Sequence, residues 1–200
     1  MNFLAHAYLA GPADADRVGG VIGDFVKGRL DPPPAGYSAE LLAGVALHRR
    51  IDSYADAHPA FRRSRERVSP ARRRVAGIMV DMFYDHFLAL RWPSFSAQPL
   101  EAFAADSYRL LNEQTAGLPL PPVFFGMLRH MVAEDWFSAY RQPARIARAL
   151  DGMAEHRLRQ PNPLAGAGEE LLAHYAGFEA DCLAFLADAA VFTAGLRTAR

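Results

Sequence analysis

Proline and glycine divide this sequence of 200 residues into stretches of helical length. The breaks fall at 11-GP-12, 31-DPPP-34, 58-HP-59, 92-WP-93, 117-GLPLPP-122 and 142-QP-143. Proline has no N–H to donate and pushes the residue before it out of the α region, so a helix normally ends there. Between the breaks, apolar residues recur at spacings of three and four, and Val and Ile are few. We therefore expect an all-α protein.

The breaks and the apolar spacing together predict nine helices. Ser38 and Ser69 stand where N-caps would, and Pro70 suits the first position of a helix. Residues 160–168 are typical of a surface loop. The expected helices cover about residues 2–10, 14–28, 39–57, 60–67, 70–91, 97–115, 121–138, 143–155 and 169–196, the last with a break near Gly177.

Length and composition indicate one domain, residues 1–200, because 51% of the residues are apolar and two small domains would each bury much less. The formal net charge is zero, which gives no support for a nucleic-acid or membrane partner. Cys182 is the only cysteine, which fits a reducing compartment. No apolar run is long enough to span a bilayer, and MNFLAHAYLA lacks the features of a signal peptide, so we expect a cytoplasmic protein.

The stretch 79-MVDMFYDHFLALRW-92 places Asp81, Asp85 and His86 in an otherwise apolar helix. Burying a carboxylate without a partner costs several kcal/mol, so such groups pair with a cation or hold a metal. Asp81 and Asp85 are four residues apart and share one face. Two carboxylates at this spacing repel each other unless a divalent cation lies between them.

His48 and Asp52 repeat the i, i+4 arrangement on the expected helix 39–57, and Asp24 lies late in the expected helix 14–28. Imidazoles and carboxylates without thiolates suit manganese, iron or magnesium rather than structural zinc. The alternative is that each group is satisfied separately, for example by Arg49, Arg50 or the run 72-RRR-74. His6 could be a metal ligand, a group that orients a ligand or contacts substrate, or a packing residue, and we favour the second role. We expect structural or surface roles for His58, His130, His156 and His174.

Four segments, in this order and at these separations, resemble the acyl carrier protein phosphodiesterase family, also called acyl carrier protein hydrolases. They are MNFLAHAYLA, GGVIGDFVKG, HRRIDSYAD and VDMFYDHFLALRW, all within about residues 1–95. The resemblance implies an all-helical fold related to the HD phosphohydrolases and a divalent metal, manganese in the first place, with magnesium or iron as alternatives. It also implies hydrolysis of the phosphodiester between 4′-phosphopantetheine and a serine of holo-acyl carrier protein.

The resemblance extends to single residues. Ordinary HD enzymes have an adjacent His-Asp doublet, whereas this chain has Asp85-His86 in reversed order and His48 apart from Asp52. From residue type and spacing, we expect Asp52 or Asp85 to accept a proton from water and His86 or His6 to protonate the leaving seryl oxygen. Asp24 belongs to the same expected catalytic set. The positions that match the family's polar residues, and that we expect to hold the metal, are Asp24, His48, Asp52, Asp81, Asp85 and His86.

Residues 49–74 contain nine arginines against three acidic residues, a local excess of six positive charges. Acyl carrier proteins are acidic as a family, so this segment is expected to attract and orient the substrate. We expect Arg49 and Arg50 to bind the phosphate, and Arg62, Arg63, Arg65 and Arg67 to contact the carrier protein. Ordinary solvated helix faces or internal ion pairs are the alternative use of these arginines. No residue is assigned to the pantetheine arm, because the aromatic residues are expected in the core.

Two other functions fit the sequence. A nucleotide phosphohydrolase of the wider HD group would keep the metal and change the substrate. A helical interaction protein would pair its polar groups internally and hold no metal.

Overall fold

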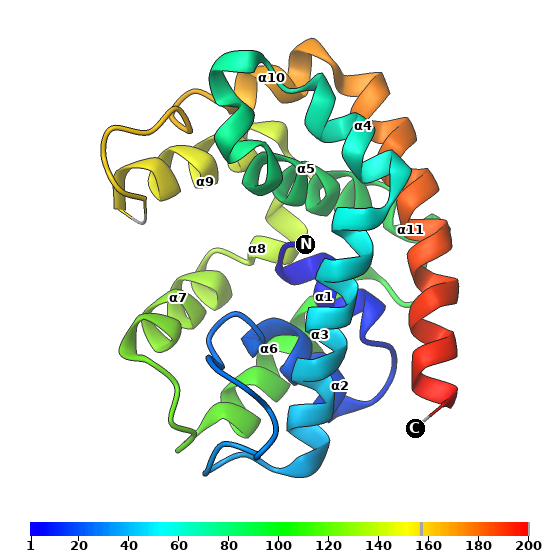
Figure 1. Ribbon diagram of the computed structural model, residues 1–200, viewed down its shortest axis with the longest axis vertical. Helices are drawn as coiled ribbons and strands as arrows, with labels where there is room; N and C mark the ends of the chain where they lie inside the picture. Colours follow the sequence, from blue (N-terminus) through cyan, green and yellow to red (C-terminus); the bar gives the residue numbers. More distant parts are fainter. Residues whose placement is uncertain (157, 200) are drawn as a thin grey trace.

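The computed structural model describes residues 1–156 and 158–199, and this part of the chain is helical with no β-strand (Figure 1). The all-α expectation is confirmed. The helices, including the short 3-10 helices η1 and η2, are α1 (Phe3–Leu9), α2 (Asp14–Ile22), α3 (Ala39–Ala57), α4 (Pro59–Arg67), η1 (Pro70–Val75), α5 (Ala76–Leu90), η2 (Trp92–Ser94), α6 (Leu100–Thr115), α7 (Pro122–Ala133), α8 (Trp136–Ala139), α9 (Pro143–His156), α10 (Gly168–Ala173) and α11 (Tyr175–Thr198).

Helix α5 is the centre of the fold. It packs against α1, α4, α9 and α11, and Figure 1 shows it running across the molecule between them. Its aromatic residues Phe83, Tyr84 and Phe87 are fully buried in one hydrophobic cluster that includes residues of α1, α3 and α11. Since burial of such side chains contributes about 1.5–3 kcal/mol each, α5 anchors whatever its neighbours carry.

Helices α2 and α3 cross with their backbones in contact. A Cβ atom added at Gly19 would lie 2.6 Å from the carbonyl carbon of Gly44, and one added at Gly44 would lie 2.6 Å from the carbonyl oxygen of Ala15. Only glycine permits so close an approach. The crossing at Gly44 fixes the position of α3. His48 is one turn further along α3 and therefore lies against the end of α2.

Several helices begin and end as the sequence predicts. The expected helix 39–57 is α3, and the Ser38 side chain accepts a hydrogen bond from the Leu41 N–H at 3.2 Å, as an N-cap does. Helices α1, α4 and α9 also lie within one or two residues of the expected ranges. In these segments the local signals and the tertiary packing agree.

The expected helix 14–28 is too long, because α2 ends at Ile22. Gly23 lies against the His48 ring, and Asp24 follows in a turn rather than in a helix. The carbonyls of Val26 and Gly28 accept hydrogen bonds from the Arg49 guanidinium, at 2.8 and 2.9 Å, in place of helical N–H donors. A side chain of α3 therefore holds this turn.

The expected helix 70–91 is also two elements, since it starts as η1 and becomes α-helical only at Ala76. Ser69 makes no capping bond with its side chain. Its N–H and hydroxyl both donate to Glu170 instead, at 2.8 and 2.5 Å. Contacts with α10 thus override the local N-cap signal.

Three other helix boundaries differ from the expected ones. The segment 121–138 is interrupted where Asp135 adopts a left-handed conformation, φ 43°, which separates α7 from α8. The last segment breaks at His174 and not at Gly177. Gly177 lies inside α11, where its missing side chain leaves room for the Arg67 guanidinium. Helix α6 begins at Leu100 rather than at 97, directly after Pro99.

Candidate metal centre and adjoining cavity

His6, His48 and Asp52 form a cluster between α1 and α3. One side-chain atom from each lies within 4.8 Å of the others, so the three could share one metal ion. The Nε2 atoms of His6 and His48 lie 3.1 Å from Oδ1 and Oδ2 of Asp52 respectively. The i, i+4 spacing of His48 and Asp52 places both on one face of α3, and α1 brings His6 to the same face.

Contacts with the end of α2 fix the orientation of the His48 ring. Its Nδ1 donates a hydrogen bond to the Gly20 carbonyl at 2.7 Å, since a carbonyl oxygen can only accept. Histidines that bind metals usually make such a bond with the nitrogen that faces away from the ion. A Cβ atom added at Gly23 would lie 2.2 Å from Cγ of His48, so this ring needs glycine beside it.

His6 is buried and unsatisfied. Neither of its ring nitrogens makes a hydrogen bond, although Nε2 is close to Asp52, and the ring stacks on His48 with centroids 3.8 Å apart. Burial, and then the neighbouring His48, lower the pKa of His6 to about 3. A neutral imidazole with an unpaired nitrogen aimed at a carboxylate is suited to bind a cation, so the residues present fit a divalent metal.

Burial disfavours the charged form of His48, but Asp24 and Asp52 outweigh it and raise the pKa of His48 to about 9. Burial likewise disfavours the carboxylate form of Asp52, but His48 and His6 outweigh it and hold the pKa of Asp52 far below the ordinary value. Asp52 is therefore a carboxylate, and without a metal His48 carries the balancing proton. A metal ion would replace this proton at Nε2.

Asp24 and Asp81 extend the acidic side of the cluster. Asp24 is exposed, and its Oδ1 lies 3.6 Å from Nε2 of His48. The amino group of Met1 lies 2.8 Å from Oδ1 of Asp52 and 3.2 Å from Oδ1 of Asp81, so a cation already lies between these two carboxylates. Burial raises the pKa of Asp81. Among residues 1–156 and 158–199, no arginine pairs with any of the three aspartates.

Asp85 and His86 are not brought to the cluster. Asp85 accepts hydrogen bonds from the backbone N–H groups of Leu4 and Ala5, each at 2.9 Å, and so satisfies the first turn of α1. Burial raises the pKa of Asp85 to about 7, despite these two donors. His86 lies on another side of α5, between the Tyr140 carbonyl and the Tyr175 hydroxyl, both at 2.8 Å. Asp85 thus supports the helix that carries His6.

The arginines of residues 49–74 are mostly engaged within the molecule. Arg49 holds the turn after α2, and Arg63 and Arg67 pair with the buried Asp181 of α11 at 2.8 and 2.9 Å. Arg72 pairs with Glu170, and Arg65 pairs with Asp56. Arg62 donates to the Asp56 carbonyl, whereas Arg50 is exposed and has no hydrogen-bond or ion-pair partner among the described residues.

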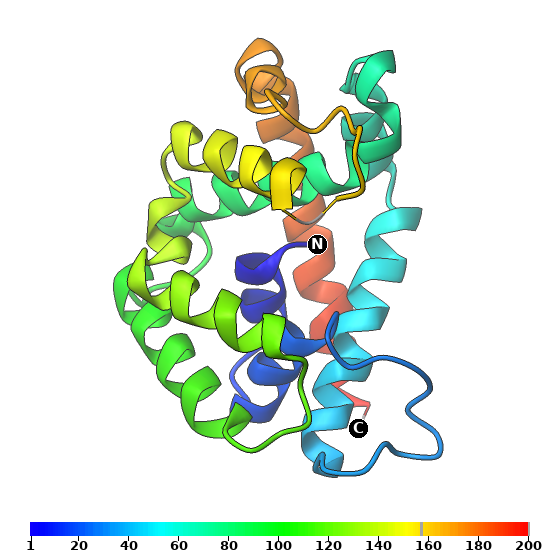
Figure 2. The same ribbon diagram turned by 90° about the vertical axis from the view of Figure 1, so that its left-hand side faces the viewer.

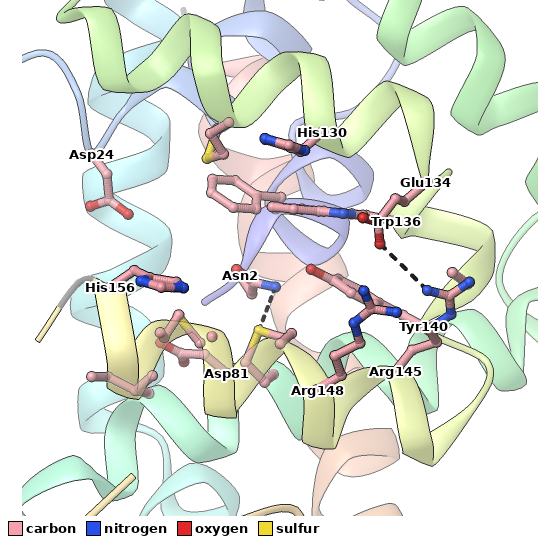
Figure 3. A pocket seen from close by; sticks show the side chains of 18 of the residues that line it. Asn2, Asp24, Asp81, His130, Glu134, Trp136, Tyr140, Arg145, Arg148 and His156 are labelled. Atoms are coloured by element: carbon pink, nitrogen blue, oxygen red, sulfur yellow. Dashed lines mark hydrogen bonds and ion pairs between the residues drawn. The ribbon is translucent and has the colours of Figure 1, made fainter. Parts of the chain in front are cut away.

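A cavity of about 640 Å³ opens beside the cluster and is lined by residues of α5, α7, α8 and α9 (Figure 3). Helix α9 packs against α5, and in Figure 2 it lies above α7. Its walls are largely apolar, with Met82, Met127, Met153 and Trp136 among them. A smaller hollow of about 240 Å³ adjoins Asp52. The two share Met1, Asp24 and Asp81, so the acidic cluster lies where they meet.

Polar residues line both ends of this cavity, and only some of them have a signal in the sequence. Figure 3 shows Asp24, Asp81 and His156 towards one end, and Glu134, Arg145 and Arg148 towards the other. His130 and His156, expected in structural or surface roles, line the cavity. They come from α7 and α9, which meet around this space only in the folded chain, so no spacing within one helix could identify them.

No helix among the described residues is long and apolar enough to cross a membrane.

Comparisons with known proteins agree with one another. Residues 1–189 match a family profile described as acyl carrier protein phosphodiesterase. The curated relatives include proteins of that name from Photorhabdus laumondii, 36% identical over 90% of this chain and 88% of the relative, and from an Enterobacter strain, 36% identical over 90% of each. A relative of the same name from Salmonella agona is 37% identical over 90% of each chain. No solved structure matches the chain.

Proposed function

The chain belongs to the acyl carrier protein phosphodiesterase family, and from this premise we propose that it hydrolyses holo-acyl carrier protein with a divalent metal held by His6, His48 and Asp52. The bond that breaks is the phosphodiester between the carrier-protein serine and 4′-phosphopantetheine. The products are the apo-carrier protein and 4′-phosphopantetheine. The observation that carries the metal is the buried His6 ring, which stacks on His48 and whose Nε2 lies 3.1 Å from Asp52 without a hydrogen bond.

A divalent ion in such a site supplies positive charge beside the phosphoryl oxygens and lowers the pKa of bound water. Manganese, magnesium and iron suit this nitrogen and carboxylate set, and manganese is our first choice. His48 binds with Nε2 because Gly20 occupies Nδ1. Asp85 and His86 lie outside the ligand set that we propose, since their polar atoms are satisfied by α1, Tyr140 and Tyr175.

Asp24 is the carboxylate best placed to accept the proton of the attacking water. It lies at the solvent-exposed edge of the cluster, where the two cavities meet, and its oxygen is 3.6 Å from His48. Asp81 lies on the opposite wall and adds negative charge that favours a bound cation. Both histidines already contact the carboxylate of Asp52. Asp24 is therefore freer than Asp52 to act as the general base.

Metal content and phosphopantetheine release test this proposal together. His48→Ala and Asp52→Asn should each weaken Mn²⁺ binding by more than about a hundredfold, since even the outer partners of metal ligands cost 10–100-fold, and release should fall in parallel. His174→Ala and Asp14→Asn change the same residue types at exposed positions and should leave both unchanged. Full metal binding in His48→Ala would contradict the ligand set.

The substrate is tested separately with the wild-type protein and Mn²⁺. Holo-acyl carrier protein should lose its prosthetic group, whereas nucleoside mono-, di- and triphosphates should remain intact. Turnover of nucleotides without release of phosphopantetheine would instead support the nucleotide phosphohydrolase.

A further inference from the structure

The larger cavity is continuous with the metal cluster and has the length of the prosthetic group. Arg145 and His156, both of which line it, are eleven residues apart on α9, or about 16 Å along the helix axis. From phosphorus to sulfur, phosphopantetheine contains about thirteen bonds, which extend over about 15 Å at the reach of a peptide chain. One end of the cavity lies at Asp24 and Asp81, where the phosphoryl group would react.

The walls also match the chemistry of the arm. Pantetheine has a gem-dimethyl carbon and methylene pairs, which need apolar contact, and two amides with a hydroxyl, which need a few polar partners. The cavity provides Met127, Met153 and Trp136 for the first, and His130 and Glu134 for the second. Its volume of about 640 Å³ lies in the range of small-ligand sites.

Two glycines on facing walls keep this space open. Gly126 of α7 and Gly152 of α9 both line the cavity, and both are within helices, where glycine costs about 0.5–1 kcal/mol relative to alanine. A Cβ atom added at Gly152 would meet nothing within 4 Å, and one at Gly126 would meet only the end of Arg129, at 3.9 Å. Packing therefore does not require glycine at either position, and the space beside both glycines is open to a ligand.

We propose that the pantetheine arm of the carrier-protein substrate lies in this cavity, extended from Asp24 and Asp81 towards Trp136 and Arg148, with Gly126 and Gly152 leaving room for it. The proposal rests on the proposed function. It places the carrier protein itself outside the cavity, at the end where the metal cluster lies. The phosphodiester then spans the junction between the larger cavity and the hollow beside Asp52.

The test fills the cavity from either wall. Gly126→Leu and Gly152→Leu place a branched side chain into the space without a backbone clash, and Gly195→Leu is the matched control, since Gly195 is also helical with nothing near its Cβ and lines neither cavity. We expect kcat/KM for holo-acyl carrier protein to fall by at least about tenfold in the two cavity variants, because the arm loses its contacts, and to stay near wild type in the control.

Two further readouts separate this inference from the function on which it rests. Mn²⁺ should raise the melting temperature of all four proteins equally, and hydrolysis of bis(4-nitrophenyl) phosphate, which has no pantetheine arm, should be equal in all four. Unchanged turnover of the carrier protein in both cavity variants would overturn the inference and leave the function standing. A parallel loss of both hydrolytic activities would overturn it too, because the substitutions would then act on the metal cluster. A wild type that releases no phosphopantetheine would overturn the function and the inference together.

Discussion

The orientation of one imidazole depends on two backbone positions, one near the end of α2 and one in the turn after it. Gly20 accepts the hydrogen bond from His48 Nδ1, and Gly23 leaves the space in which the ring lies. Because a bound ion would need Nε2 to face Asp52 and Asp24, the missing side chain at Gly23 is part of the geometry of the cluster. The sequence block GGVIGD thus positions an imidazole on another helix.

Gly23→Ala should disable the cluster without changing any of its polar groups. The added Cβ would lie 2.2 Å from Cγ of His48, so the ring must turn or the turn must move. We expect Mn²⁺ affinity, measured by calorimetry, to fall by about 10–100-fold, as it does when a partner that orients a metal ligand is lost. Helix content by circular dichroism should change little.

Gly195→Ala is the control, because a Cβ there meets nothing within 4 Å and Gly195 is exposed near the end of α11. It should keep wild-type affinity and gain a few tenths of a kcal/mol in stability, since alanine is the better helix former. Equal affinity in both variants would show that the ring of His48 does not bind the ion.

Residue spacing predicted His48 and Asp52 together but could not place the ionisable groups of α5. Successive residues of a helix turn by about 100°, so Asp85 and His86 point in different directions. Spacing shows that they differ in direction, but not that Asp85 meets the N–H groups of α1 while His86 meets Tyr140 and Tyr175. His6 joins the cluster because α1 packs on α5 and α3, a tertiary contact without a local signal.

At the scale of elements, Glu170 holds η1 to α10. It is 8% exposed and accepts hydrogen bonds from the Ser69 N–H, the Ser69 hydroxyl and Arg72. Burial raises the pKa of Glu170, but Ser69 and Arg72 outweigh it and hold the pKa below the ordinary 4.5. The unfolded chain therefore takes up this proton first as the pH falls, and the stabilisation is complete above about 4.5 and lost below it.

Glu170→Gln should lower the free energy of unfolding by about 1–3 kcal/mol at pH 7, because an amide NH₂ would face donors and the charge that binds Arg72 is removed. Urea titrations of wild type and variant at pH 7, 5 and about 3.5 measure the difference, which should shrink towards the lowest pH as Glu170 becomes protonated in the wild type. Glu169→Gln, one residue earlier and exposed, is the control. A difference independent of pH would mean that the charge of Glu170 contributes nothing.

Helix boundaries were predictable where a local signal decides them, as with the Ser38 cap of α3 and the proline that opens α9. They were not predictable where a distant side chain takes over the backbone groups. Glu170 takes the N–H of Ser69, and Arg49 takes the carbonyls of the turn after α2. Asp24 is for this reason in a turn and not in a helix, which exposes its carboxylate at the edge of the cluster.

At the scale of the whole molecule, the arginines of residues 49–74 fall into two classes. Arg63 and Arg67 neutralise Asp181, which is 4% exposed, and so join α4 to α11. Only Asp181 is buried and the arginines are partly exposed, so these ion pairs connect the two helices at the edge of the core. Arg50 and Arg74 are exposed and without partners among the described residues, and they remain available to an acidic protein.

These two classes of arginine should respond differently to substitution. If the free arginines attract the carrier protein, KM for the holo form should rise steeply between about 20 and 300 mM salt, as the screening length shortens from about 20 Å to below 8 Å. Arg50→Gln with Arg74→Gln should raise KM at low salt and flatten the salt response, with unfolding stability unchanged. Arg63→Gln should instead lower stability and change the salt response less, because its guanidinium is held in an ion pair with Asp181. A KM that does not change with salt in the wild type would exclude electrostatic docking, and contact through apolar surface around the cavity mouth would then have to bind the carrier protein.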